Sequence, residues 1–200
     1  DILSGRIAIS QVRRVELEDL LGREPVQLDN EGLHRLLTDK VVMVTGAGGS
    51  IGSELCRQIA RFSPKLLIFY ELSELALYSI EQEFAGQPVR CLIGDVKDEL
   101  RLETVFREHQ RAVVFHAAAY KHVPLMENNN AWQAVLNNVL GTRVLAETAI
   151  RHGVEKFVLI STDKAVNPTN VMGATKRLAE LLCQSLQAGT DTQFVIVRFG

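Results

Sequence analysis

An acid and a base stand side by side in the stretch Ser161-Thr162-Asp163-Lys164, and a second lysine, Lys176, follows on a helical pattern. An elimination needs such a pair, since one group removes a proton while the other protonates the departing hydroxyl. The pKa values of both groups would have to be tuned by burial and by each other. The same two residues can also form an exposed ion pair worth under about 1 kcal/mol. The sequence leaves both interpretations open.

A glycine-rich turn lies between a short apolar run and a segment of helical period. Gly46, Gly49 and Gly52 give the spacing G-x-x-G-x-x-G. The first glycine permits a tight turn, the second lets the backbone approach a pyrophosphate, and the third lets the helix pack against the strand. Amides at the helix start, at Ser50 and Ile51, can bind phosphate. This context predicts a dinucleotide site rather than a structural turn.

Two carboxylates follow the next strands. Glu71 lies about 20 residues after the last glycine, where an acidic side chain binds the ribose hydroxyls of the adenosine. Its alternative is a solvated strand end. Asp95 can bond the adenine amino group or cap the helix that starts near Asp98. Ser73 can accommodate a 2′-phosphate, so the predicted cofactor is NAD(P), with the choice between NAD and NADP open.

The elements that position these residues alternate between strand and helix. Six apolar, β-branched runs predict strands buried on both faces: Val41–Thr45, Leu66–Tyr70, Arg90–Ile93, Ala112–His116, Lys156–Ile160 and Phe194–Arg198. Helical stripes lie between them, for example Leu178, Leu181, Leu182 and Leu186. The pattern predicts an α/β fold, a doubly wound parallel sheet of Rossmann type with six strands, and ligands at the carboxyl ends of the strands.

The first 40 residues lack this rhythm. We expect them to form a linker or short helical extension, with residues 41–200 as the NAD(P)-binding domain. One short amphipathic helix is predicted between Val12 and Leu21, ended by Gly22 and Pro25. A second is predicted from Asn30 to Leu37, with Asn30 as its N-cap.

Composition narrows the class of protein. The chain is 46% hydrophobic and 23% charged with a formal net charge of −2, which gives no electrostatic basis for a nucleic-acid partner. Cys56, Cys91 and Cys183 match no metal spacing, and no apolar run approaches the roughly 20 residues of a membrane span. We expect no metal site. His116 is expected to be a packed strand-end residue, and both chain ends are expected to be fragment ends.

Several motifs resemble a known superfamily. The glycine turn, Gly94-Asp95-Val96 and His116-Ala117-Ala118-Ala119 resemble the extended short-chain dehydrogenase/reductases. Three further stretches resemble the UDP-N-acetylglucosamine 4,6-dehydratases of bacterial polysaccharide biosynthesis: Tyr120-Lys121-His122-Val123-Pro124, Asn138-Val139-Leu140-Gly141-Thr142, and Ser161-Thr162-Asp163-Lys164-Ala165-Val166-Asn167-Pro168. The resemblance covers about residues 41–200.

The resemblance implies roles for individual residues. NAD(P) takes a hydride from C4 of a UDP-sugar, Lys164 removes the C5 proton, and Asp163, if protonated, gives a proton to the C6 hydroxyl. Thr162 bonds the sugar O4, and Lys176 bonds the nicotinamide ribose. Further cofactor contacts are implied for Val96, Ala117, Ala118, Ala119 and Asn138, and contacts to cofactor or sugar for Lys121 and His122. Asn138 can instead simply cap or kink its helix. A homo-oligomer is possible.

One position departs from the superfamily pattern Tyr-x-x-x-Lys. Met172 occupies the place of the tyrosine, and a thioether can neither give nor accept a proton. The long, membrane-anchored dehydratases resemble this chain here, which implies a parent protein anchored in the bacterial inner membrane with this domain in the cytoplasm. The base for the first step is left unassigned. An epimerase and a non-catalytic NAD(P)-binding module are the alternatives, and we expect these 200 residues to turn over little substrate alone.

Overall fold

The computed structural model describes residues 29–109 and 113–200. The chain divides into two compact units, residues 1–31 and 32–200. The helix predicted between Val12 and Leu21 lies outside the described residues. The second predicted helix is present as α2 (Asn30–Leu37). It includes Asn30 as its first residue, whereas the sequence pattern predicts Asn30 just before the helix.

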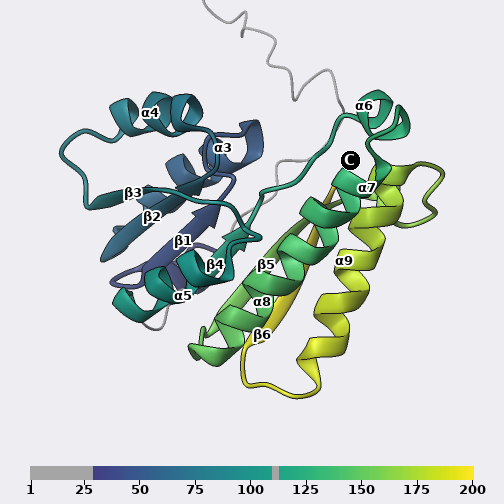
Figure 1. Ribbon diagram of the computed structural model, residues 1–200. Coiled ribbons are helices and arrows are strands. Elements are labelled where there is room, and N and C mark those ends of the chain that lie inside the picture. The colour runs from purple at the N-terminus through teal and green to yellow at the C-terminus, as the bar shows by residue number, and fades with distance from the viewer. Residues whose placement is uncertain (1–28, 110–112) are drawn as a thin grey trace, which may run out of the picture. The chain divides into compact units, whose positions relative to one another are not determined.

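The second unit is built on one six-stranded, fully parallel sheet (Figure 1). Its strands are β1 (Val41–Thr45), β2 (Leu66–Glu71), β3 (Val89–Ile93), β4 (Val113–His116), β5 (Lys156–Thr162) and β6 (Gln193–Phe199). They run in the order β3-β2-β1-β4-β5-β6, which is the doubly wound order with its reversal between β1 and β4. The predicted fold class is therefore confirmed, and the strand bounds agree to within two residues where they are described.

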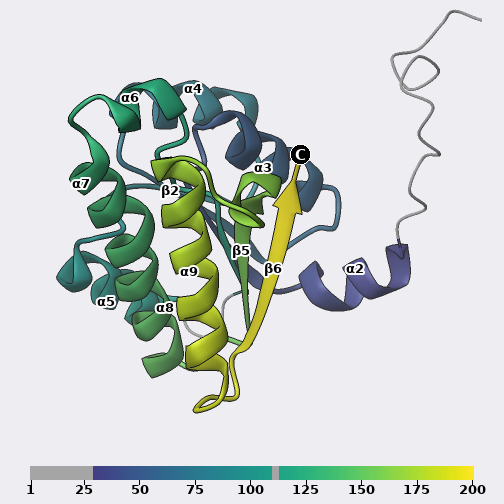
Figure 2. The same ribbon diagram turned by 90° about the vertical axis from the view of Figure 1, so that its right-hand side faces the viewer.

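Helices connect the strands as right-handed crossovers require. They are α3 (Ser50–Ala60), α4 (Glu74–Glu83), α5 (Glu99–Glu108), α6 (Val123–Glu127), α7 (Ala131–Ala134), α8 (Gly141–Arg151) and α9 (Val171–Gln187), with a π-helical segment η3 (Val135–Leu140) between α7 and α8 and a 3-10 turn η4 (Asp163–Ala165) after β5. Figure 2 shows α8 and α9 side by side along β5 and β6.

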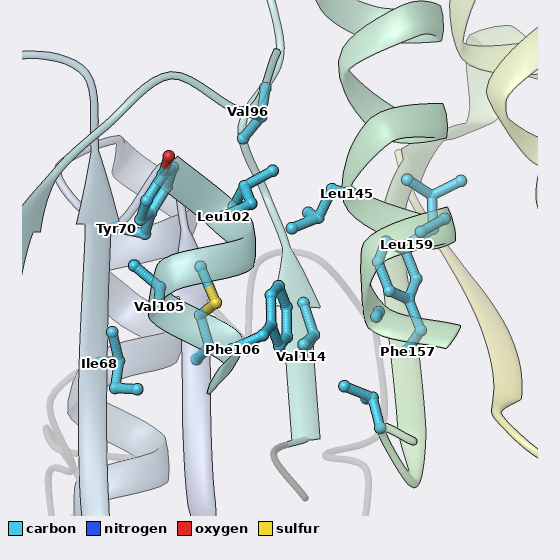
Figure 3. Packing of buried hydrophobic residues seen from close by; sticks show 14 of the residues in the cluster. Ile68, Tyr70, Val96, Leu102, Val105, Phe106, Val114, Leu145, Phe157 and Leu159 are labelled. Carbon is cyan, nitrogen blue, oxygen red and sulfur yellow. The ribbon is translucent and has the colours of Figure 1, made fainter. Parts of the chain in front are cut away.

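Each face of the sheet has its own core, because successive strand residues point to opposite sides. Met43 packs on one side with the buried faces of α5, α8 and α9, including Leu102, Leu145 and Ala179 (Figure 3). Its neighbours Val42 and Val44 pack on the other side with α3 and α4. This sandwich buries β1, β2, β4 and β5 almost completely.

Two expectations about burial are corrected. The edge strands β3 and β6 contain partly covered and exposed residues and none that is buried, rather than being buried on both faces, because the helices pack mainly over the central strands. On α9 the predicted leucine stripe is not the buried face, since Leu178 and Leu181 are exposed. The helix instead buries Met172, Gly173, Thr175, Lys176, Ala179, Glu180 and Cys183.

Candidate functional site

The glycine turn joins β1 to α3 at the carboxyl edge of the sheet. Gly46 has a φ of +68°, in the left-handed region that favours glycine. A Cβ there would lie 2.7 Å from the backbone of Ala118 in the loop after β4. A Cβ at Gly48 would lie 2.5 Å from Cβ of Ala76, and one at Gly52 would run into the Gly46 carbonyl oxygen. The turn therefore holds the start of α3 close to β1 and to the loop after β4.

Glu71 is joined to this turn. Its Oε2 accepts a hydrogen bond from the amide of Gly48 at 3.0 Å, and its Oε1 accepts one from the amide of Ser73 at 3.0 Å. Ser73 is itself the N-cap of α4, and its hydroxyl accepts from the amide of Ala76 at 3.3 Å. A cavity of about 270 Å³ opens here and is lined by Gly46, Gly48, Gly49, Glu71, Leu72, Ala76, Ala117, Ala118, Ala119, Tyr120 and Asn137.

Asp95 lies beyond this cavity, at the end of β3. Its carboxylate accepts from the amide of Lys97 at 2.9 Å and from the ammonium of the same residue at 2.8 Å. The N-cap of α5 is Asp98, whose side chain accepts from the amide of Arg101 at 3.0 Å, so the alternative role of Asp95 as the helix cap is wrong. Val96 is buried and lines neither of the cavities at the carboxyl edge.

A second cavity of about 310 Å³ lies at the carboxyl ends of β4, β5 and β6. It is lined by Ile51, Ala117, Ala119, Tyr120, Lys121, Val123, Ile160, Ser161, Thr162, Lys164, Met172, Lys176, Phe199 and Gly200. The structure thus brings together Thr162 and Lys164 from the end of β5 and the adjoining η4, Lys176 from α9 and Lys121 from the loop after β4. Ala117, Ala119 and Tyr120 line both cavities, so the two spaces adjoin along one loop.

Lys176 is buried on α9, with 6% of its surface exposed. Its ammonium donates a hydrogen bond to the carbonyl oxygen of Ile160 on β5. Burial lowers the pKa of Lys176 to about 8, because a charged group loses its hydration there. This lysine is not a solvated helix residue. It is held at the cavity wall, within reach of a ligand.

Asp163 and Lys164 form an ion pair at the cavity mouth. Their charged atoms are 3.2 Å apart, and the side chains are 58% and 52% exposed. The hydroxyl of Thr162 also donates to Asp163 at 3.0 Å. Hydrogen bonds from Thr162 and Lys164 hold the pKa of Asp163 below its usual value. In this chain, then, Asp163 is an ionised group, and the lining includes Lys164 but not Asp163.

Asn138 fixes the loop after β4. It lies buried in the π-helical segment, and its Oδ1 accepts from the amide of Tyr120 at 2.8 Å while its Nδ2 donates to the carbonyl of Tyr120 at 3.0 Å. Nδ2 also donates to the hydroxyl of Thr175 on α9 at 3.1 Å. Asn138 thus touches the backbone of the loop that both cavities share. His122 directly precedes α6 and makes no side-chain cap bond.

His116 sits fully buried at the end of β4. The Thr142 hydroxyl donates to the carbonyl of Asn138 at 2.7 Å, so its oxygen accepts from Nε2–H of His116 at 2.9 Å. Nδ1 of the imidazole then accepts from the hydroxyl of Thr45 at 2.7 Å. Burial lowers the pKa of His116 to about 3. The histidine is a neutral packing residue with both ring nitrogens bonded, as the sequence predicts.

Three residues of the site were missed by sequence reasoning. Tyr120 stands out in the sequence only as part of a motif, yet it lines both cavities. Glu180, which is fully buried, and Arg198, which is 38% exposed, form an ion pair behind the second cavity. Glu180 lies on the buried face of α9, and the leucine pattern predicted a different face of this helix as the buried one.

A larger cavity, of about 690 Å³, lies elsewhere. It is at the amino ends of β5 and β6 and is lined by Gly32, Arg35, Leu36, Ile150, Gly153, Val154, Glu155, Lys156, Thr190, Asp191, Thr192 and Gln193. Ligands of open parallel sheets bind at the carboxyl ends of the strands, so its size does not make it the primary candidate. Over residues 29–109 and 113–200, no group of three or more His, Cys, Asp or Glu could hold a metal ion. In the same ranges, none of the helices has the length and hydropathy to cross a membrane.

Comparison with known proteins adds a family to this geometry. The profile of the family described as "Polysaccharide biosynthesis protein" matches residues 42–200. The chain is similar to the capsular polysaccharide biosynthesis protein CapD of Staphylococcus aureus, with 51% identity over all of this chain and 34% of that protein. It is also 32% identical to a UDP-N-acetylglucosamine 4,6-dehydratase (inverting) of Campylobacter jejuni, over 82% of this chain and 50% of the relative.

A UDP-glucose 4-epimerase of Rickettsia massiliae is equally similar, with 32% identity over the same shares of the two chains. Among solved structures, Pen from Bacillus thuringiensis superposes with a TM-score of 0.77 at 35% identity, over 82% of this chain and 51% of that one. The chain spans between a third and a half of the length of these relatives.

Proposed function

The chain belongs to the polysaccharide biosynthesis protein family, and from that premise we propose that the whole protein is a nucleotide-sugar 4,6-dehydratase. Its substrate would be UDP-N-acetylglucosamine and its product a UDP-4-keto-6-deoxy sugar used for surface polysaccharide. One observation carries the proposal: Thr162, Lys164 and Lys176 meet in a cavity that adjoins the glycine turn.

The residues of the first cavity fit a dinucleotide. A Cβ at Gly46 or Gly48 would collide with Ala118 or Ala76, so only glycine lets the turn pack this closely, and the start of α3 supplies amides and a partial positive charge. Glu71 stands where a carboxylate meets the adenosine ribose, and its negative charge favours NAD over NADP. When bound, the cofactor supplies an acceptor for the hydride of C4 and returns that hydride at C6.

The second cavity would hold the sugar. Thr162 would bond O4, and Lys164 would remove the proton from C5 once C4 is a ketone. Asp163 would then have to protonate the leaving C6 hydroxyl. Because its pKa is lowered while it is exposed, this role requires substrate or the remainder of the protein to cover the pair, since burial raises the pKa of a carboxyl group.

The Asp163–Lys164 pair favours a dehydratase over an epimerase, because an epimerase would leave the adjacent acid and base without a task. Met172 does not discriminate between the two reactions, since both begin with oxidation at C4 and need a carrier for the O4 proton other than this thioether. The epimerase relatives are equally similar, so the product decides between the two activities.

The test uses the full-length protein with UDP-N-acetylglucosamine and identifies the product by mass and NMR. A 4-keto-6-deoxy product supports the proposal, and a C4 epimer supports the alternative. Asp163→Asn and Lys164→Ala should each abolish turnover while NAD binding stays near wild type. Lys40→Ala is the matched control, because it breaks another exposed ion pair, with Glu155 at 2.9 Å, at the opposite edge of the sheet.

Absence of any 4-keto or epimerised product, with NAD still bound, would favour a non-catalytic NAD(P)-binding module. We also propose that the whole protein is anchored in the bacterial inner membrane with this domain facing the cytoplasm. Membrane fractionation of the full-length protein tests this, and recovery in the soluble fraction would contradict it.

A further inference from the structure

One buried carboxylate joins three elements around the second cavity. Glu180 on α9 has no exposed surface. Its carboxylate accepts from the hydroxyl of Ser161 on β5 at 2.7 Å, and from Arg198 on β6 through Nε at 2.8 Å and Nη2 at 2.6 Å. Ser161 and Arg198 are register partners in the sheet, so their side chains lie on the same face. Arg177 adds a further bond at 3.1 Å.

These bonds lie directly beside the residues that line the cavity. Ser161 is followed by Thr162 at the end of β5, and Arg198 is followed by Phe199 at the end of β6. One turn before Glu180 on α9, Lys176 bonds the carbonyl of Ile160. The helix is therefore attached to β5 at two successive residues, and to β6 at a third.

We infer that Glu180 is a positioning residue of the proposed dehydratase site, which holds Thr162 and Lys176 at fixed places and sets a negative charge one helical turn from Lys176 on the same buried face of α9. The inference rests on the proposed function for its catalytic consequence only. Glu180 is fully buried while Arg177 and Arg198 are more than a third exposed, so loss of their bonds would leave a buried charge without compensation.

The electrostatic part follows from the groups that interact with Lys176. They are Glu180 and Cys183 on α9 and His116 on β4. Burial lowers the pKa of Lys176, and Cys183 and Glu180 oppose that effect.

Only one of these two opposing groups is charged near neutral pH. Burial raises the pKa of Cys183 to about 12, so the thiol is neutral. Hydrogen bonds from Arg198 lower the pKa of Glu180 to about 2, so its carboxylate is ionised. Glu180 is therefore the negative partner that favours the protonated form of Lys176.

The experiment replaces Glu180 in the full-length protein by glutamine, which keeps the shape and removes the charge. Lysines labelled with ¹³C at Cε report the titration of Lys176 by NMR, and a Lys176→Arg variant assigns the signal. Glu83→Gln is the matched control, because Glu83 pairs with Arg57 through the same two guanidinium atoms, at 2.8 and 3.1 Å, on an exposed surface. Ser161→Ala is a milder variant that removes only the bond to β5.

In Glu180→Gln, the titration midpoint of Lys176 should move to lower pH by roughly half a unit or more, and kcat should fall about tenfold or more with a smaller change in KM. Ser161→Ala should lower kcat while the Lys176 titration stays in place. Glu83→Gln should change neither quantity. An unmoved Lys176 titration in a folded Glu180→Gln protein overturns the electrostatic part, and wild-type kcat in both site variants overturns the positioning part. Because the titration needs no substrate, it stands even if no 4-keto product ever forms.

Discussion

Replacing Gly52 by alanine is expected to separate α3 from β1 and to disable the proposed dinucleotide site. The new Cβ would run into the carbonyl oxygen of Gly46 and would lie 2.7 Å from the Gly46 carbonyl carbon and 3.0 Å from Cα of Ala47. All three are backbone atoms, so no change of side-chain rotamer relieves the contact. The helix has to move outward, and Cys56 and Ile59, buried on its inner face, move with it.

The cost can be estimated from this geometry. Overpacking a core position costs about 1–3 kcal/mol, while alanine gains at most about 1 kcal/mol over glycine within a helix. We expect a net loss of about 2 kcal/mol, or about 4–8 °C in Tm for a chain of this size. Displacing the amides at the helix start should also weaken NAD binding about tenfold or more, which corresponds to about 1.4 kcal/mol.

Differential scanning calorimetry and isothermal titration with NAD measure the two effects. Gly189→Ala is the matched control, because a Cβ there meets nothing within 4 Å, and it should leave both Tm and NAD affinity at or slightly above wild type. A Gly52→Ala protein with the Tm and NAD affinity of the wild type would refute the reasoning, since the close approach of α3 to the turn would then have no energetic consequence.

Three further predictions address other residues. The pKa of His116 is about 3 in the folded protein and about 6.5 in the unfolded chain. Its contribution to the free energy of unfolding is complete above about pH 6.5. As the pH falls below that value, the free energy of unfolding should decrease by about 1.4 kcal/mol per pH unit. Urea unfolding at pH 7 and pH 5 should show this slope and should show less of it in His116→Gln. Glu71→Ala should weaken NAD about tenfold to a hundredfold, because a hydrogen bond to a charged group contributes about 1.5–3 kcal/mol; unchanged affinity in calorimetry would contradict the ribose role. Asn138→Ala removes the partner of both backbone groups of Tyr120 and should lower the free energy of unfolding by about 2–4 kcal/mol. A loss below about 0.5 kcal/mol would show that Asn138 is not needed to hold the loop after β4.

The sheet could be predicted because its signal is local and repeated. Each buried strand is a short β-branched run, and the glycine turn identifies the first strand and its helix, so the order of the sheet follows from the connection rules. The partial exposure of β3 and β6 could not be predicted in the same way. Whether a strand lies at the edge of the sheet depends on the tertiary fold, and an apolar run such as Val195–Val197 has the same pattern at an edge as in the middle.

The grouping of residues at the candidate site could be predicted in part. Thr162, Lys164 and Lys176 could be grouped from the sequence because two of them lie at the end of a strand and the third follows on the next helix. The ionised, exposed state of Asp163 could not be predicted, since it depends on what covers the residue. Glu180 was not predicted because four leucines on α9 share a helical period that pointed to a different face of the helix. Arginines stabilise this fully buried carboxylate, and one of them, Arg198, lies on β6 and is distant in the sequence.

The two bonds of Glu71 have a consequence for how a ligand would arrive. The Glu71 carboxylate accepts hydrogen bonds from the amide of Gly48, in the turn after β1, and from the amide of Ser73, at the start of α4. The backbone around the first cavity is therefore held in place before a ligand binds. Association then requires little loop ordering, and more of the contact energy appears as affinity. We therefore expect the proposed dinucleotide to bind a preformed site, with its dissociation rate constant setting how fast it exchanges.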